Sequence, residues 1–73
     1  LGNIGPDAKQ AVPHLILALQ DDKSWVRKSA AEALDNIGPD AKQAVPHLIL
    51  ALQDDDEYVR YCAVEALGKI RNT

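Results

Sequence analysis

Two histidines, His14 and His47, stand 33 residues apart and are the side chains whose type and spacing could most readily do chemistry. Imidazole nitrogens bind transition metals, but a metal site needs further ligands at suitable distances. The only cysteine, Cys62, falls on a different predicted helix. On a helical wheel both histidines lie opposite Val12, on the outer face. The pattern favours solvated histidines, with a metal site or a partner contact as the alternatives.

The acidic run Asp54–Glu57 raises the question of calcium. It lacks the alternating oxygen ligands and the central glycine of a calcium loop. Acidic side chains at the start of a helix interact well with the helix dipole, which explains the run without a metal. Cys62 takes the position of Ser29 in an internal repeat, so we expect a small buried side chain. Since no catalytic triad, phosphate loop or zinc spacing is present, we predict no enzyme activity and no cofactor.

Composition limits the classes of partner. The chain has 8 Lys and Arg against 11 Asp and Glu, a net charge of −3, which argues against a nucleic-acid partner. Its longest apolar run, Leu15–Leu19, is too short to span a membrane. There is no basic and apolar leader, and a single cysteine suits a reducing compartment, so a cytoplasmic setting is expected.

The histidines belong to a block that occurs twice without a difference. The sequence NIGPDAKQAVPHLILALQDD fills positions 3–22 and again positions 36–55, a period of 33 residues. The remainder of each unit is less alike: between 23–36 and 56–69, 6 of 14 positions match. Each unit therefore has a constant half and a variable half, as expected of a structural unit that stacks.

Each unit is predicted to hold two helices. In the first, Val12, Leu15, Ile16 and Leu19 form one apolar face. Because Pro13 cannot lie deep in a helix without cost, either this helix starts near Ala11 or a short turn at 7–10 leads into it with a kink.

The second helix carries its own boundary signals. Asp22 and Asp55 are predicted as its N-caps, and Gly38 followed by Pro39 is predicted to end its first copy. No strand alternation occurs, so the chain is predicted to be all-α.

Stacking sets the expected domain organisation. One helical pair cannot bury its apolar face alone. We expect one repeat domain over 1–73, with the tail of a preceding helix at 1–4, repeats at 5–37 and 38–70, and a C-terminal tail at 71–73. The opening Leu1–Ile4 matches the end of a second helix at 34–37, so a fragment of a longer array is expected. Uncapped ends would then favour self-association.

The residues resemble the short HEAT-like repeats named after phycobilisome lyases, rather than ankyrin or tetratricopeptide repeats. The match is carried by Ala11-Val12-Pro13, Leu15, Ala18-Leu19 and Asp21, then by Val26-Arg27, Ala30, Ala33-Leu34 and Ile37-Gly38, and again from Ala44 to Ile70. The resemblance implies an α-solenoid of the HEAT-like or armadillo-like kind, a right-handed superhelix of helix–turn–helix repeats. It also implies that Asp21, Arg27, Asp54 and Arg60 form a structural ladder that ties successive repeats together.

In such stacks the second helices line the concave surface, and exposed aromatic residues are typical interface anchors. We expect a partner-binding surface of Trp25, Lys28, Glu32, Tyr58, Tyr61 and Glu65. The alternative buries Trp25 against an upstream repeat and Tyr58 against the first unit. Leu17 and Leu50 share the outer face with His14 and His47, and these four are candidates for a lateral contact, although isolated exposed leucines are common.

The resemblance also raises two enzyme classes. Phycobilisome lyases attach bilins with this fold, and nothing in the repeat distinguishes them from their relatives. Deoxyhypusine hydroxylases hold iron with His-Glu pairs where this chain has Lys28-Ser29 and Tyr61-Cys62, so that activity is not expected. The resulting hypothesis is a non-enzymatic scaffold for a protein partner. Its alternatives are a part of a bilin lyase, and a designed or recently duplicated repeat without a specific partner.

Overall fold

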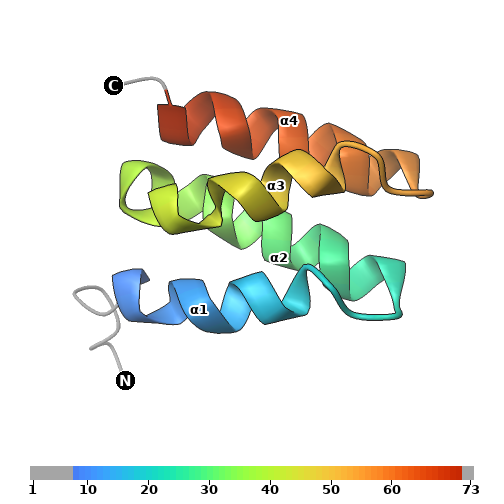
Figure 1. Cartoon of the computed structure of the whole chain (residues 1–73), viewed down its shortest axis with the longest axis horizontal. Coiled ribbons are helices and arrows are strands. Elements are labelled where there is room, and N and C mark those ends of the chain that lie inside the picture. Colours follow the sequence, from blue (N-terminus) through green and yellow to red (C-terminus); the bar gives the residue numbers. More distant parts are fainter. Residues whose placement is uncertain (1–7, 72–73) are drawn as a thin grey trace.

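The structure, a computed structural model, describes residues 8–71 of the 73-residue chain. These residues form α1 (Ala8–Ala18), α2 (Ser24–Ile37), the 3-10 helix η2 (Gly38–Ala44), α3 (Val45–Ala51) and α4 (Glu57–Arg71), with no strand among them. The helices run along the long axis of the molecule, with α1 and α4 on opposite sides and α2 and α3 between them (Figure 1). The all-helical prediction is confirmed for this range. The predictions for 1–4 and 72–73 lie outside the described residues.

The first helix of the unit differs between the two identical copies. In the first copy α1 runs from Ala8 through Pro13 as one helix, so a start near Ala11 is wrong. In the second copy the equivalent stretch is broken at Ala41, whose φ and ψ of −97° and 22° are not helical, and α3 begins only at Val45. The predicted kinked lead-in is therefore present in the second copy, where Pro46 lies in the first turn and needs no N–H partner.

The surroundings of the second copy account for this break. Ala41 and Ala44 are completely buried, and η2 packs against α1, α2 and α4. The Lys42 ammonium also donates a hydrogen bond to the Ile70 carbonyl at the end of α4, 3.4 Å away. Their counterparts at the start of α1 are only half-buried or exposed. Tertiary contacts, not local propensity, decide the local conformation here.

The N-cap prediction was wrong by one residue. Helix α4 begins at Glu57, and the Asp56 carboxylate caps it by accepting from the backbone N–H groups of Tyr58 at 2.8 Å and Val59 at 3.4 Å. Helix α2 has Lys23 in the equivalent place, without a side-chain cap. Asp22 and Asp55 lie one position too early because the turn extends one residue further than the sequence pattern indicated.

Gly38 ends α2 as predicted. Its φ of 74° is a conformation that side chains other than glycine rarely adopt, and its N–H donates to the Leu34 carbonyl. At the equivalent position of the second unit stands Arg71, and α4 continues through it.

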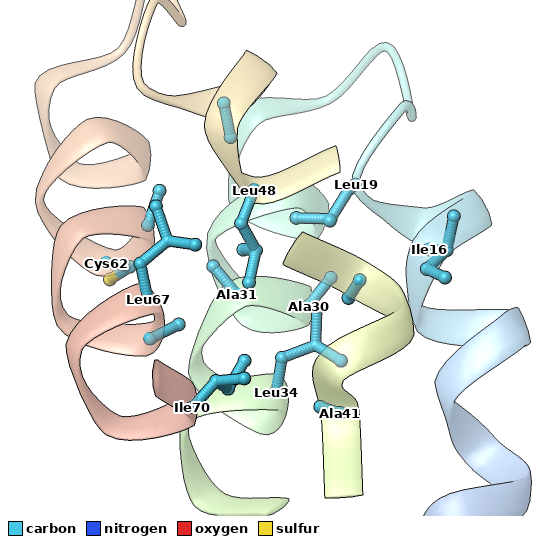
Figure 2. Close-up of a cluster of buried hydrophobic side chains, with 14 of the residues drawn as sticks. Ile16, Leu19, Ala30, Ala31, Leu34, Ala41, Leu48, Cys62, Leu67 and Ile70 are labelled. Atoms are coloured by element: carbon cyan, nitrogen blue, oxygen red, sulfur yellow. The ribbon is translucent and has the colours of Figure 1, made fainter. Parts of the chain in front are cut away.

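The core lies between the helices and consists of small aliphatic side chains (Figure 2). Its largest fully buried members are Leu34, Leu48, Ile70, Val12 and Val59. Alanines on the facing sides of α2 and α4, among them Ala30, Ala31, Ala63 and Ala66, are also buried. Because alanine has a short side chain, the two helices pack closely, and this pair positions the surface described next.

Candidate functional site

The second helices of the two units, α2 and α4, share one exposed aromatic surface. Trp25 and Tyr58 occupy equivalent positions in the first turns of the two helices, and Tyr61 lies one turn further along α4. Their exposed fractions are 65%, 63% and 64%. The alternative in which Tyr58 is buried against the first unit is therefore wrong. Three exposed aromatic side chains on neighbouring helices provide apolar area that a partner could cover.

A hollow of about 200 Å³ lies between α2 and α4 beside Tyr61. It is lined by the predicted residues Glu32, Tyr61 and Glu65, together with Asp35 and Cys62. The structure thus brings half of the predicted partner-binding residues to one place. Trp25, Lys28 and Tyr58 lie on the same two helices but do not line the hollow.

Carboxylates dominate the electrostatics of this hollow. The Lys28 ammonium lies 3.3 Å from Glu32 Oε2, and the Lys69 ammonium lies 3.6 Å from Asp35 Oδ1. Asp35 Oδ1 is shielded from solvent and has no hydrogen-bond partner among the described residues. Glu65 has no ion-pair partner within the described range. Neither lysine lines the hollow, and three carboxylates against these two lysines leave one net negative charge there, at Glu65.

Cys62 lies at the bottom of the same hollow. It is buried, as predicted, and its thiol donates to Glu32 Oε2 over 3.9 Å. Burial, reinforced by the negative charge of Glu32, raises the pKa of the Cys62 thiol. The thiolate, which is the reactive form of cysteine, is therefore disfavoured at this position.

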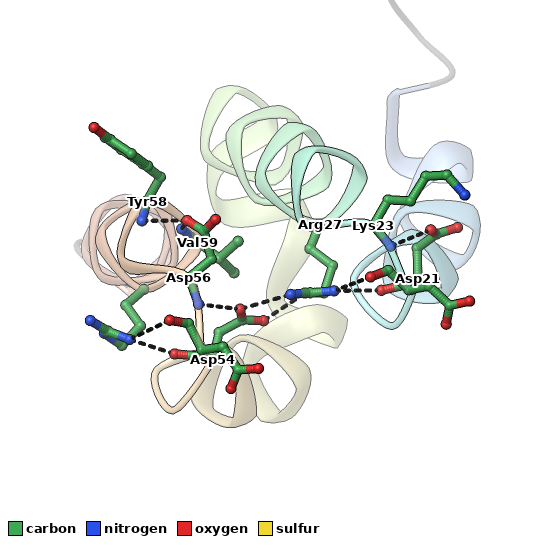
Figure 3. Close-up of polar contacts among 10 residues, drawn as sticks. Asp21, Lys23, Arg27, Asp54, Asp56, Tyr58 and Val59 are labelled. Carbon is green, nitrogen blue, oxygen red and sulfur yellow. Dashed lines mark hydrogen bonds and ion pairs between the residues drawn. The ribbon is translucent and has the colours of Figure 1, made fainter.

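The predicted ladder residues lie near the N-terminal ends of α2 and α4 and in the turns that precede these helices (Figure 3). Arg27 of the first unit reaches Asp54 of the second through two parallel hydrogen bonds, Nε to Oδ2 at 2.6 Å and Nη2 to Oδ1 at 3.0 Å. Its Nη1 donates to the backbone carbonyls of Asp21 and Asp22, at 2.8 and 3.0 Å. One guanidinium therefore joins both inter-helix turns, a geometry that lysine could not reproduce.

Asp54 is the other centre of this network. Its Oδ1 also accepts from the Asp56 N–H at 2.9 Å, which closes the turn before α4. The hydrogen bonds from Arg27 lower the pKa of the Asp54 carboxyl, although burial acts in the opposite direction. The pair is nearly covered, with side-chain exposures of 17% for Arg27 and 10% for Asp54. Charged hydrogen bonds shielded in this way contribute more than those of a surface ion pair.

The outer-face residues lie away from the aromatic surface, on α1 and α3. Leu17 and Leu50 are 69% and 73% exposed, while His14 is exposed and His47 half-buried. The prediction that both histidines are solvated therefore holds for His14 and only in part for His47. Within residues 8–71, no three histidine, cysteine or acidic side chains are grouped so that they could hold a metal ion. The lateral contact remains a prediction.

Sequence reasoning missed two residues on α2 and α4. Asp35 lines the hollow, and Val64, one turn beyond Tyr61, is 55% exposed. Both stand where the two units differ, since Asp35 is replaced by Gly68 and Ala31 by Val64. Attention to size changes in the variable half would have identified them.

Comparison with known proteins adds one match. A protein-family model described as HEAT repeats matches residues 12–73. No curated protein matches the chain. In the described part of the structure, no helix combines the length and the apolar character that crossing a membrane requires.

Proposed function

We propose, from the premise that this chain belongs to the HEAT repeat family, that it is a scaffold segment that binds a protein partner through α2 and α4 and catalyses no reaction. HEAT repeats commonly mediate protein–protein interaction and are generally non-enzymatic. Within the family, the Ala-Val-Pro and Val-Arg motifs favour the short repeats of the phycobilisome-lyase type, with units at 5–37 and 38–70 stacked as an α-solenoid. The likeness to these repeats concerns the repeat unit and does not extend to lyase chemistry.

The exposure of Trp25, Tyr58 and Tyr61 carries the proposal. Aromatic side chains give a large contact area at a small cost in conformational entropy, and they dominate binding energy at many interfaces. Each of the three keeps more than half of its surface in water, although smaller aliphatic residues of the same helices are buried. A partner that covers them would remove this apolar area from solvent.

The charge of the hollow favours a basic segment in the partner. Three carboxylates, Glu32, Asp35 and Glu65, surround it next to the ring of Tyr61. An arginine or lysine side chain could pair with a carboxylate there and stack on the aromatic ring. We therefore expect the partner to place a basic residue between flanking apolar residues.

Selection from a randomised peptide display library tests this proposal. Peptides that bind the wild-type chain should be rich in Lys or Arg, and the double variant Tyr58→Ala/Tyr61→Ala should weaken their binding at least about tenfold. The matched control is Leu17→Ala/Leu50→Ala, which removes similarly exposed apolar side chains from the outer face. Binding lost in the control but kept in the tyrosine variant would overturn the proposal. So would the absence of any binding peptide.

A further inference from the structure

The two copies of the repeated block bury opposite faces. In the first copy Val12, Ile16 and Leu19 are buried, whereas their equivalents Val45 and Leu52 are half-buried. The middle pair differs most, since Ile16 is 9% exposed and Ile49 is 47% exposed. The second unit covers this face in the first copy, whereas in the second copy Val45 and Leu52 still pack against the core and Ile49 is left exposed.

On the other face of the block the order is reversed. The second copy buries Ala41, Ala44, Leu48 and Ala51, whereas the equivalents in the first copy are all half-buried, namely Ala8, Ala11, Leu15 and Ala18. Since the side chains are the same, composition cannot cause the difference. Each copy buries the face that meets the other unit and leaves its opposite face open.

The second helices repeat this relation. Ala31 of α2 is completely buried against the second unit, and its equivalent on α4, Val64, is 55% exposed. Conversely, three residues of α4 are completely buried against the first unit, whereas their equivalents on α2 are half-buried. They are Val59, Ala66 and Ile70, with the equivalents Val26, Ala33 and Ile37. Within residues 8–71 the two units therefore have two end faces that the described residues cover only in part. We define the leading face as Ala8, Ala11, Leu15, Ala18, Val26, Ala33 and Ile37, and the trailing face as Val45, Ile49, Leu52, Val64 and Gly68.

Among the described residues, the hydrogen-bond network of Arg and Asp side chains also leaves one group without an ion-pair partner at each end of the two units. Arg60 Nη1 donates to the carbonyls of Asp54 and Asp55, at 2.6 and 3.2 Å, as Arg27 does one unit earlier. Arg27 has a carboxylate partner in the next unit, but no described residue supplies one to Arg60. The Asp21 carboxylate closes its turn by accepting from the Lys23 N–H at 2.9 Å, as Asp54 does, but has no guanidinium partner in the described residues. A donor thus stands beside the trailing face and an acceptor beside the leading face.

We propose that the trailing face docks the leading face of a second copy of this chain, head to tail, with Arg60 of one copy paired to Asp21 of the other. The junction between the two units within the chain is the template, because the new junction carries the same residues on both sides except at two positions of the trailing face, where Val64 and Gly68 replace Ala31 and Asp35. The apolar parts of both faces would be buried again, and the Arg–Asp pair would fix their register.

This geometry predicts the form of the assembly. A head-to-tail contact uses two different surfaces, so each added copy leaves one trailing and one leading face open. Association should produce open chains whose mean length increases with protein concentration, and no oligomer of fixed size.

Sedimentation velocity from low micromolar to about millimolar protein tests the apolar part of the contact. The wild-type mass should rise with concentration, and Ile49→Glu should weaken association at least about tenfold by placing a charge in the junction. Leu50→Glu is the matched control, since Leu50 is the next residue and more exposed but lies off the trailing face. A wild-type monomer at every concentration, or equal effects of both variants, would overturn the proposal. Unchanged far-ultraviolet circular dichroism verifies that both variants fold.

A charge exchange tests the direction of the contact. Arg60→Asp alone and Asp21→Arg alone would each place like charges at every junction, so each should associate at least about tenfold more weakly than the wild type. In an equimolar mixture the two variants can alternate along the assembly, so that every junction pairs an Asp with an Arg, and the mixture should recover the wild-type mass. A mixture that remains as dissociated as its components would exclude the head-to-tail arrangement. The variants leave Trp25, Tyr58 and Tyr61 unchanged, so failure here would not affect the peptide-binding result.

Discussion

The stretch Ala8–Asp22 and its copy Ala41–Asp55 have the same sequence but different structures and different burial. The first forms an unbroken helix and buries Val12, Ile16 and Leu19, while the second bends at Ala41 and buries Leu48 with three alanines. Only the neighbours differ, since one copy meets a unit on its trailing side and the other on its leading side. The comparison shows that the block encodes a helix with two usable apolar faces, and that its neighbours decide which face enters the core.

Truncation of one leucine in each copy should give the largest difference in stability between them. Leu48→Ala removes a completely buried side chain and should lower the free energy of unfolding by about 3 kcal/mol, whereas Leu15→Ala at the half-buried equivalent should lower it by about 1 kcal/mol. Urea unfolding followed by circular dichroism measures both. Equal losses would show that the two copies contribute alike to the core.

A second pair of variants separates the contribution of the turn hydrogen bond from that of the contact with Arg27. Asp54→Ala loses the turn hydrogen bond to Asp56 and both bonds from Arg27, so we expect a loss of about 2 kcal/mol in unfolding free energy. Asp21→Ala loses only the equivalent turn bond to Lys23, and less than about 1 kcal/mol is expected. The difference, measured by urea unfolding at low protein concentration, isolates the contact with Arg27. If Asp21→Ala cost as much, the ladder would add nothing beyond the turn.

The pH dependence of stability also measures the contribution of the contact between Arg27 and Asp54. Arg27 lowers the folded-state pKa of Asp54 below its unfolded value of about 3.9. The pair therefore contributes stability that is fully present above this unfolded value and is lost as the pH falls through the folded pKa. We expect the stability gap between wild type and Asp54→Asn to be constant from neutral pH to about 5 and to shrink below about 4. In an Arg27→Gln background this pH dependence should disappear; its persistence would assign it to other groups.

The smallest expected effect concerns the helix caps. Lys23→Asp would give α2 the cap that Asp56 gives α4, and should raise the free energy of unfolding by about 0.5 to 1 kcal/mol. Thermal unfolding of this variant beside Asp56→Ala, which should lose a similar amount, measures both caps on one scale. A destabilised Lys23→Asp would indicate that crowding with Asp21 and Asp22 outweighs the cap.

Patterns that depend on local chemistry were predictable from the sequence. Gly38 ends α2 because few other residues tolerate its backbone conformation, and the 33-residue repeat with its 3.6-residue apolar spacing indicated four helices. Exposure of Leu17 and Leu50 also followed from the helical wheel. These features depend on the residue and its immediate neighbours along the chain.

Features that depend on neighbours in space were not predictable in the same way. The kink at Ala41, absent after the identical residues in α1, is set by packing of η2 against α1, α2 and α4. The role of Asp35 in the hollow depends on how α2 and α4 are paired, which a single helical wheel does not contain.

The buried thiol of Cys62 is a built-in probe of local opening of the molecule. Alkylating reagents react with the thiolate, and burial both shields this sulfur and raises its pKa. A reagent too bulky to enter the hollow beside Cys62 must therefore wait until α4 separates from α2. When reclosing is faster than alkylation, the labelling half-life of the folded protein reports the population of that opened state. Because the chain has a single cysteine, the signal belongs to one helix pair without any engineered probe.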